Sequence, residues 1–296
     1  MKEELMEFGI LEENVSLETL NTYRIKTHTK YLLHPRNEQD VLHFFKYAKE
    51  KELDFFILGN GSNVILSDTM YDGVILKLDQ LKKIEYKEYE VTVGAGVMIN
   101  FLARDILERG LSGLEWASGI PGTVGGSIYG NAEAYKVSTF EYLKSVRYIT
   151  PDGNIKTSFK EEISHAYRTS FFKENPGHII LEATFVFPEG EKEKSLAIIK
   201  DRLQRRLASQ PLEYPSAGSV FRNPAPDMPS GKLIDDLGLK GKRIGDAMIS
   251  VKHANFIINL GNATGKDIRS LIQLIHDEVE RVYHIDLILE QEIKKW

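Results

Sequence analysis

Apolar residues recur at helical spacing in four stretches of the chain. Asn37 can cap the first stretch, Gly110 is placed to follow the end of the second, and Pro211 comes just after the third. The fourth begins at Thr264, three residues before Asp267, which is the spacing of a capping box. We therefore expect four helices, with the apolar stripes of the third and fourth turned inward. The apolar residues of the four stretches are Val41, Phe44, Phe45 and Ala48; Phe101, Leu102, Ile106 and Leu107; Leu196, Ile199, Leu203 and Leu207; and Ile268, Leu271, Ile272, Ile275, Val279 and Val282.

Short runs rich in Val, Ile, Leu and Phe lie between these stretches and predict strands. Two of them flank a polar glycine turn, Gly59-Asn60-Gly61-Ser62-Asn63, in a small unit of βαββ type. A turn at the carboxyl end of a strand is a favoured ligand position in open α/β sheets. Asn-Gly is also the strongest short hairpin signal, so a simple hairpin remains an equal alternative. The strands are expected at 54–58, 73–78, 90–96, 146–150 and 179–187.

Residues 117–132 contain five glycines and no charged side chain. Glycine inside an element costs stability, so this density indicates backbone that turns through positive φ or passes close to a bulky group. Exposed N–H groups in such turns suit phosphates or a flat polar ring. No GK[ST] sequence follows and the spacing is not GxGxxG, which excludes a P-loop and a Rossmann fingerprint. The alternative is a tight loop without a ligand.

Composition excludes several classes of function. The chain of 296 residues has a formal charge of −5 without a basic stripe, which argues against a nucleic-acid partner. No apolar run is long enough to span a membrane, and the acidic N-terminus does not resemble a signal peptide, so a cytoplasmic protein is expected. Cysteine is absent, and the eight histidines lack HxH or HExxH spacing. Thiol chemistry is excluded, and no catalytic metal is expected.

Three polar segments could carry chemistry. Arg168 lies among aromatic residues and offers a planar fork for a carboxylate or phosphate, although it could equally be a surface arginine packed on phenylalanine. Ser219 lacks a GxSxG elbow and could be an ordinary turn serine, but it could donate a proton to a strongly basic acceptor such as an enolate. Strand alternation would place Glu290 and Glu292 on one face, unless the segment is only a solvated tail.

Taken together, six segments in this order resemble the UDP-N-acetylenolpyruvoylglucosamine reductase family over almost the whole chain. The resemblance implies an α+β fold: a two-lobed FAD-binding fold of the vanillyl-alcohol-oxidase (PCMH) type plus a C-terminal α+β substrate-binding domain. Lobe 1 is expected at 1–78, to which a strand at 289–296 can return, lobe 2 at 79–207, and the substrate-binding domain at 208–288. The matching segments are 21–24, 58–63, 119–131, 167–171, 218–224 and 289–293.

The resemblance also implies cofactors and site residues. NADPH would reduce noncovalently bound FAD, which would then pass hydride to C3 of the enolpyruvyl ether of UDP-N-acetylglucosamine. Arg168 would stabilise the resulting enolate, Ser219 would protonate C2, and Glu292 would either be protonated itself or polarise the carboxyl group. The FAD pyrophosphate is expected at Asn60, Gly61, Ser62 and Asn63, the flavin at Gly119, Ile120, Gly122, Thr123 and Gly126, and the substrate at Tyr167, Asn223, Lys240 and His253.

The sequence departs from the family pattern at two places. It lacks the insertion with an extra substrate-covering tyrosine, so it resembles the short branch of the family, and Gln291 stands where proline is common. Two alternatives remain: an FAD oxidoreductase of the same fold that acts on a small alcohol or sugar, and a non-catalytic nucleotide-sugar binding protein. The presence of Arg168, Ser219 and Glu292 together favours the reductase, for which a monomer is expected.

Overall fold

The computed structural model describes residues 1–296, and the chain divides into two compact units. The first unit consists of residues 1–13, 31–59 and 73–203, and the second of residues 14–30, 60–72 and 204–296. Both units contain helices and strands, as expected for an α+β protein. The finer division into two FAD-binding lobes and a substrate-binding domain stays a prediction.

A five-stranded sheet, with every neighbouring pair antiparallel, is the largest sheet of the first unit. The strands expected at 90–96, 146–150 and 179–187 are confirmed as its β7, β10 and β14. The helix α3 (Ile99–Glu108) follows β7, and Gly110 comes after its C-cap at a φ of 75°. The strand order is β11 (Ile155–Phe159), β10 (Leu143–Ile149), β14 (Ile179–Val186), β7 (Glu90–Gly94) and β6 (Ile84–Lys87).

A second sheet has the order β1 (Ile10–Ser16), β2 (His28–His34), β5 (Tyr71–Leu76) and β3 (Phe55–Ile57). The helix α2 (Glu38–Glu50) precedes β3, and the Oδ1 atom of Asn37 accepts a hydrogen bond from Asp40 N at 3.0 Å, so the predicted cap is confirmed. β3 pairs with β5 in parallel. Because hairpin strands are antiparallel, the hairpin interpretation of the turn after β3 is wrong.

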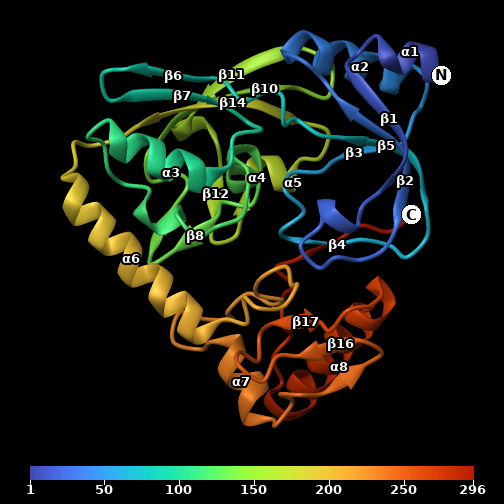
Figure 1. The fold of residues 1–296 in the computed structure, drawn as a ribbon, viewed down its shortest axis with the longest axis vertical. Helices are drawn as coiled ribbons and strands as arrows, with labels where there is room; N and C mark the ends of the chain where they lie inside the picture. The colour runs from blue at the N-terminus through green and yellow to red at the C-terminus, as the bar shows by residue number, and fades with distance from the viewer. The chain divides into compact units, whose positions relative to one another are not determined.

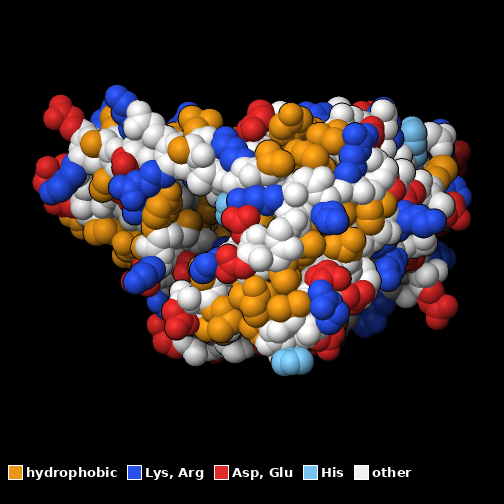
Figure 2. All heavy atoms as spheres, turned by 90° about the horizontal axis from the view of Figure 1, so that it is seen from below, with side chains coloured by type: hydrophobic (Ala, Val, Ile, Leu, Met, Phe, Trp, Pro, Cys, Tyr) orange, Lys and Arg blue, Asp and Glu red, His pale blue; other side chains and the backbone are white.

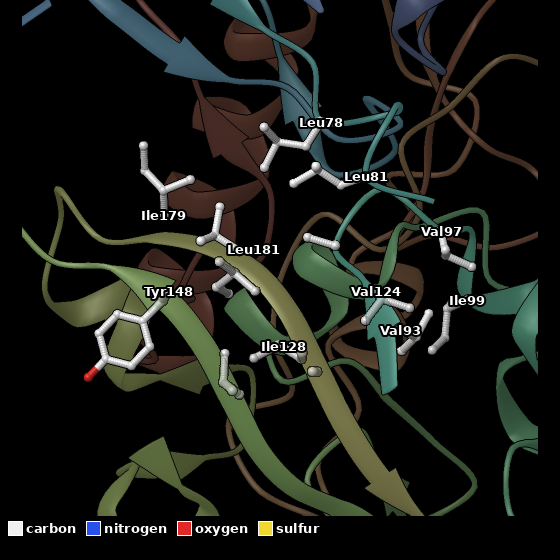
Figure 3. Packing of buried hydrophobic residues seen from close by; sticks show 14 of the residues in the cluster. Leu78, Leu81, Val93, Val97, Ile99, Val124, Ile128, Tyr148, Ile179 and Leu181 are labelled. Atoms are coloured by element: carbon white, nitrogen blue, oxygen red, sulfur yellow. The ribbon is translucent and has the colours of Figure 1, made fainter. Parts of the chain in front are cut away.

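The core of the first unit is one continuous cluster of buried apolar residues. Val93, Ile99 and Val124 come from β7, α3 and a short helix of the glycine-rich segment, and they lie together in Figure 3. Ile128 of the same short helix belongs to this cluster too. The glycine-rich segment is therefore anchored in the core through its apolar positions. The remaining elements of this unit are α1 (Lys2–Met6), η2 (Glu115–Ala117), α4 (Val124–Tyr129), β8 (Glu133–Ala134), β9 (Val137–Ser138), η3 (Lys160–Glu162), β12 (His165–Ala166), β13 (Thr169–Ser170) and α5 (Phe171–Glu174).

The second unit is built around α8 (Gly265–Tyr283), which packs against a small antiparallel sheet (Figure 1). Both hydrogen bonds of the predicted capping box between Thr264 and Asp267 are present. β18 (Glu292–Ile293) pairs in parallel with β4 (Val64–Ile65), so the end of the chain joins a segment from its first quarter. The other elements are η1 (Glu18–Leu20), α7 (Ser230–Asp236), β15 (Arg243–Ile244), β16 (Ala247–Ile249) and β17 (Ile257–Asn259).

Two of the apolar stripes are less buried than their spacing predicts. In α6 (Lys192–Ser209), Ile199 is buried, but Leu196 and Leu207 are 45% and 58% exposed. In α8, Val282 is 42% exposed, whereas the rest of the stripe is buried. The expectation that these three residues face inward is wrong, because periodicity indicates which residues share a helix face but not how much of that face is covered.

The face shown in Figure 2 carries Lys, Arg, Asp and Glu side chains interspersed with apolar ones. No field of one sign dominates this face, as the mild net charge predicts. The chain contains no helix that is both long and apolar enough to cross a lipid bilayer.

Replacing Asn37 with alanine should lower the free energy of unfolding by about 1 kcal/mol, because the N-terminal N–H groups of α2 lose their side-chain acceptor. Asn37→Ser is the matched control and should retain most of the stability, since a serine hydroxyl also caps helices. Urea denaturation of both variants tests this expectation, and equal losses for alanine and serine would contradict it.

Candidate functional site

Gly59, the residue of the glycine turn that belongs to the first unit, lies against the glycine-rich segment of the same unit. A Cβ atom on Gly59 would lie 3.1 Å from Thr123 Oγ1, and one on Gly126 would lie 3.3 Å from the same oxygen. Thr123 is the N-cap of α4, and its Oγ1 accepts a hydrogen bond from Gly126 N at 3.1 Å. Glycine at these positions therefore leaves the threonine hydroxyl bordered by bare backbone.

The glycine-rich segment is more than a loop, because residues 124–129 form α4. A Cβ on Gly125 would lie 3.0 Å from the Cβ of Ala95, so this glycine allows α4 to pack closely on the turn after β7. Two buried polar atoms in and beside this segment, Trp116 Nε1 and Ser127 Oγ, have no hydrogen-bond partner in the protein. Buried polar groups are normally paired, so these atoms and the bare backbone fit a flat ligand with polar edges such as a flavin.

Arg168 lies at the tip of a hairpin next to the end of this segment. β12 and β13 pair on either side of Tyr167 and Arg168, and Arg168 has a φ of 61°. Its Nη1 donates to Glu133 O at 3.0 Å, and its guanidinium lies 5.3 Å from the centre of the Tyr167 ring. Asn131 Nδ2 donates to Ala166 O at 2.8 Å and thereby ties the glycine-rich segment to the hairpin. The first unit thus brings the hairpin of Arg168 and Tyr167 next to the end of the glycine-rich segment.

Lys77 is a residue at the glycine turn that the sequence analysis did not identify. Its ammonium group donates to Gly59 O at 2.7 Å, and burial lowers its pKa while Asp79 acts in the opposite direction. Asp79 in turn contacts His34 Nδ1 at 2.8 Å. A lysine inside the apolar run at 73–78 was the available signal, because a partly buried ammonium needs polar partners.

In the second unit, the turn at residues 60–63 is held by backbone contacts on two sides. Gly61 has a φ of 65°, and a Cβ on it would lie 2.1 Å from Leu20 O. The N and Oγ1 atoms of Thr22 donate to Gly61 O at 3.0 and 3.3 Å. On the other side, Glu292 N donates to Asn63 O at 2.9 Å, and Asn63 Nδ2 donates to Glu290 O at 3.2 Å. The predicted pyrophosphate turn therefore lies against the strand that carries Glu292.

Ser219 is held next to the same strand. Phe221 forms an antiparallel bridge with Leu289, and Glu290 N donates to Val220 O at 2.8 Å. This pairing sets Ser219 opposite residue 291, one position before Glu292. The carboxylate of Glu292 contacts Lys294 Nζ at 3.2 Å. In the second unit, the segments of Asn63 and Ser219 thus both pair with the strand that carries Glu292, whereas Arg168 and the glycines at 119–126 belong to the first unit.

The three remaining predicted substrate residues gather around α7 in the second unit. Asn223 Oδ1 accepts from Ser230 N at 3.1 Å, and Lys240 Nζ contacts Asp235 at 2.6 Å. A Cβ on Gly231 would lie 3.1 Å from the ring of His253. Burial lowers the pKa of His253, and the positive charge of Lys240 lowers it further. Lys240 and a neutral His253 therefore supply donors suited to an anionic ligand.

Gly61→Ala should lower the free energy of unfolding well beyond the backbone strain of about 1–2 kcal/mol that a positive φ imposes on alanine, because its Cβ would overlap Leu20 O. Gly110→Ala is the matched control: its φ is 75°, but a Cβ there meets no atom within 4 Å. Thermal melting of both variants measures the difference, and similar losses would show that Gly61 serves only its own backbone conformation.

The lowered pKa of His253 predicts an acid-dependent loss of stability. Since the unfolded chain protonates this histidine near pH 6.5 while the folded protein does so only at lower pH, its contribution to stability falls as the pH decreases through about 6.5. The stability of the wild type relative to His253→Gln should therefore decrease between about pH 7.5 and 5.5. Urea denaturation at both pH values, with exposed His28→Gln as the control, measures this; a relative stability that rises on acidification would contradict it.

Comparisons with known proteins agree with this geometry. Residues 210–296 match the C-terminal domain of UDP-N-acetylenolpyruvoylglucosamine reductase, and residues 29–158 match an FAD binding domain. The reductase of Clostridium kluyveri is 40% identical over 277 residues, which cover 91% of this chain and 90% of that protein. The reductase of a Clostridium botulinum strain is 37% identical, with 96% and 92% covered.

A solved structure extends the match to the fold. The crystal structure of UDP-N-acetylenolpyruvylglucosamine reductase from Thermus caldophilus has a TM-score of 0.83 and 31% identity, and the match covers 97% of this chain and 100% of that chain. The expected α+β fold, with an FAD-binding part followed by a C-terminal domain, is therefore confirmed. On the basis of these matches over nearly its whole length, the chain belongs to the UDP-N-acetylenolpyruvoylglucosamine reductase family.

Proposed function

We propose that this protein reduces the enolpyruvyl ether of UDP-N-acetylglucosamine to UDP-N-acetylmuramate, a precursor of peptidoglycan, with FAD as the hydride carrier and NADPH as the hydride source. The observation that carries the proposal is the backbone pairing that holds the segment of Ser219 next to the strand that carries Glu292, in a chain of the reductase family. A cytoplasmic, monomeric enzyme that binds no nucleic acid is part of the same proposal.

Two sets of residues would hold FAD. Asn60, Gly61, Ser62 and Asn63 would contact the pyrophosphate, because small polar residues around a glycine suit a turn that binds a phosphate group. Gly119, Ile120, Gly122, Thr123 and Gly126 would line the flavin, for which Trp116 Nε1 and Ser127 Oγ offer further hydrogen-bonding groups. When bound, FAD would supply hydride-transfer chemistry at C3 of the substrate, with NADPH as the hydride source.

Arg168 would stabilise the charge that develops on the substrate. Hydride addition at C3 leaves an enolate at C2 that is delocalised into the carboxylate, so negative charge grows on the carboxylate oxygens. A guanidinium remains positively charged throughout and can bind both oxygens. The hydrogen bond to Glu133 O and the contact with Tyr167 orient this guanidinium before substrate arrives. Tyr167 would also border the substrate carboxylate.

Ser219 would donate its hydroxyl proton to C2, which completes addition of H₂ across the double bond. A serine is a weak acid, but the enolate carbon is basic enough to accept its proton. Glu292, on the neighbouring strand, would either be protonated itself or polarise the substrate carboxyl group. Asn223, Lys240 and His253 would bind the diphosphate, in keeping with the donors gathered around α7.

Ser219→Ala should separate the two halves of the reaction. The purified variant should retain FAD and be bleached by NADPH at the wild-type rate, whereas reoxidation by the enolpyruvyl substrate should slow by about 10²–10⁴-fold because its general acid is missing. Anaerobic stopped-flow absorbance of the flavin measures both steps, and Ser209→Ala, at the exposed end of α6, is a matched control.

Each alternative function predicts a different outcome. A wild-type protein that is colourless and takes up no FAD would refute the proposal. Flavin that is reduced by an alcohol or sugar and not by NADPH would indicate an oxidase of the same fold. Binding of the UDP-sugar without any flavin reoxidation would indicate a non-catalytic relative. Normal reoxidation of Ser219→Ala would refute the assignment of Ser219 as proton donor.

A further inference from the structure

A buried side-chain network adjoins Ser219 and Glu292 in the second unit. Gln291 immediately precedes Glu292 and is only 3% exposed. Its Nε2 donates to Ala217 O at 3.0 Å and to Gly218 O at 3.2 Å, while its Oε1 accepts from Tyr23 Oη at 3.0 Å. One carboxamide thus uses both its donor and its acceptor atoms inside the protein, and the two carbonyls that it binds belong to the residues just before Ser219.

The peptide groups directly before Ser219 include a glycine with positive φ. Gly218 has a φ of 76°, and a Cβ on it would meet no atom within 4 Å, so no neighbouring atom packs against the Cα of this glycine. The backbone pairing begins only after Ser219, at Val220 O and Phe221. The hydrogen bonds from Gln291 therefore fix the peptide groups on the near side of Ser219, where pairing with the strand has not begun.

Tyr23 fixes the orientation of the Gln291 carboxamide. Its ring is fully buried, and burial raises the pKa of its hydroxyl far above the ordinary value, so the phenol stays protonated and donates to Gln291 Oε1. This bond directs the NH₂ group of Gln291 toward the two carbonyls. Tyr23 is itself held by Asn259, whose Nδ2 donates to Tyr23 O at 2.7 Å.

We propose that Gln291 is a positioning residue that sets Ser219 for proton delivery to the substrate, and that Tyr23 supports it by fixing its carboxamide. The proposal rests on the proposed function, because it takes Ser219 as the proton donor. Gln291 does not touch the reacting atoms; it acts through the peptide groups of Ala217 and Gly218. Since Gln291 and Glu292 are adjacent, the same segment both positions Ser219 and carries Glu292.

The full-length enzyme with bound FAD provides the test. Gln291→Met keeps the length of the side chain but removes its hydrogen bonds, and Tyr23→Phe removes only the hydroxyl. Gln291→Met should reoxidise reduced flavin with the enolpyruvyl substrate about 10–100-fold more slowly, since small misplacements of a reacting group have effects of this size. Reduction by NADPH should stay within about twofold of wild type, because Ser219 takes no part in it.

The solvent deuterium isotope effect distinguishes positioning from a general structural role. Misplacement of Ser219 makes proton transfer limit reoxidation, so the isotope effect on this step should increase in Gln291→Met and, to a smaller extent, in Tyr23→Phe. Gln273→Met, at an exposed glutamine of α8, is the matched control and should leave both half-reactions and the isotope effect unchanged.

Two results would overturn the proposal: equal slowing of both half-reactions, or wild-type reoxidation with an unchanged isotope effect. If Gln291→Met fails to fold, Tyr23→Phe decides alone by the same two criteria. Failure of this inference is distinct from failure of the proposed function. A slow Ser219→Ala variant beside a normal Gln291→Met variant refutes only the role of Gln291, whereas a normal Ser219→Ala variant refutes the proton-donor assignment itself.

Discussion

The pairing of residues 289–293 with two other segments is the constraint on which the candidate site of the second unit depends. On one side Glu290 N donates to Val220 O, and on the other Glu292 N donates to Asn63 O. A strand alternates its side chains, so a shift of one residue in this pairing would exchange Gln291 with its acidic neighbours. The buried carboxamide of Gln291 opposes such a shift, because a glutamate in its place would bring a charge into a buried site lined by carbonyl oxygens.

In the first unit, the glycine-rich segment combines exposed backbone on one side with apolar residues buried in the core on the other. Val124 and Ile128 anchor α4 in the apolar cluster, while Gly125 allows it to lie against Ala95. The side of the segment near Thr123 keeps bare backbone beside Gly59 and Gly126. Glycine therefore serves two purposes in α4: Gly125 allows close packing on Ala95, and Gly126 leaves the backbone beside Thr123 uncovered by a side chain.

Much of the fold could be predicted from local patterns. Asn37, Gly110 and the Thr264–Asp267 box identified helix ends because caps are determined by a few neighbouring residues. The helix α4 was not predicted, because glycine disfavours helices, and this is offset by the cap at Thr123, by packing on Ala95 and by the burial of Val124 and Ile128. Exposure of Leu196 and Leu207 was also missed, since it depends on what other elements cover.

Only those residues of the candidate site that lie in recognisable sequence motifs could be predicted. Arg168, Ser219 and Glu292 were found through family resemblance. The positive φ of Arg168 could not be predicted, because arginine is not a residue type that indicates this backbone conformation. Lys77 and Gln291 were not recognised as parts of the site, because their partners Gly59, Tyr23 and Gly218 lie at distant positions in the sequence. Hydrogen bonds between distant segments depend on tertiary structure that a single sequence does not display.

The same long separations have a consequence for folding. Tyr23 and Gln291 are 268 positions apart, and Asn63 and Glu290 are 227 apart, so closing these loops costs chain entropy before any contact is gained. Contacts between residues so far apart in the sequence are expected to form after the helices and local hairpins. The network around Ser219 is therefore expected to be among the last parts to form, and a partly folded chain would have its helices in place without a functioning proton donor.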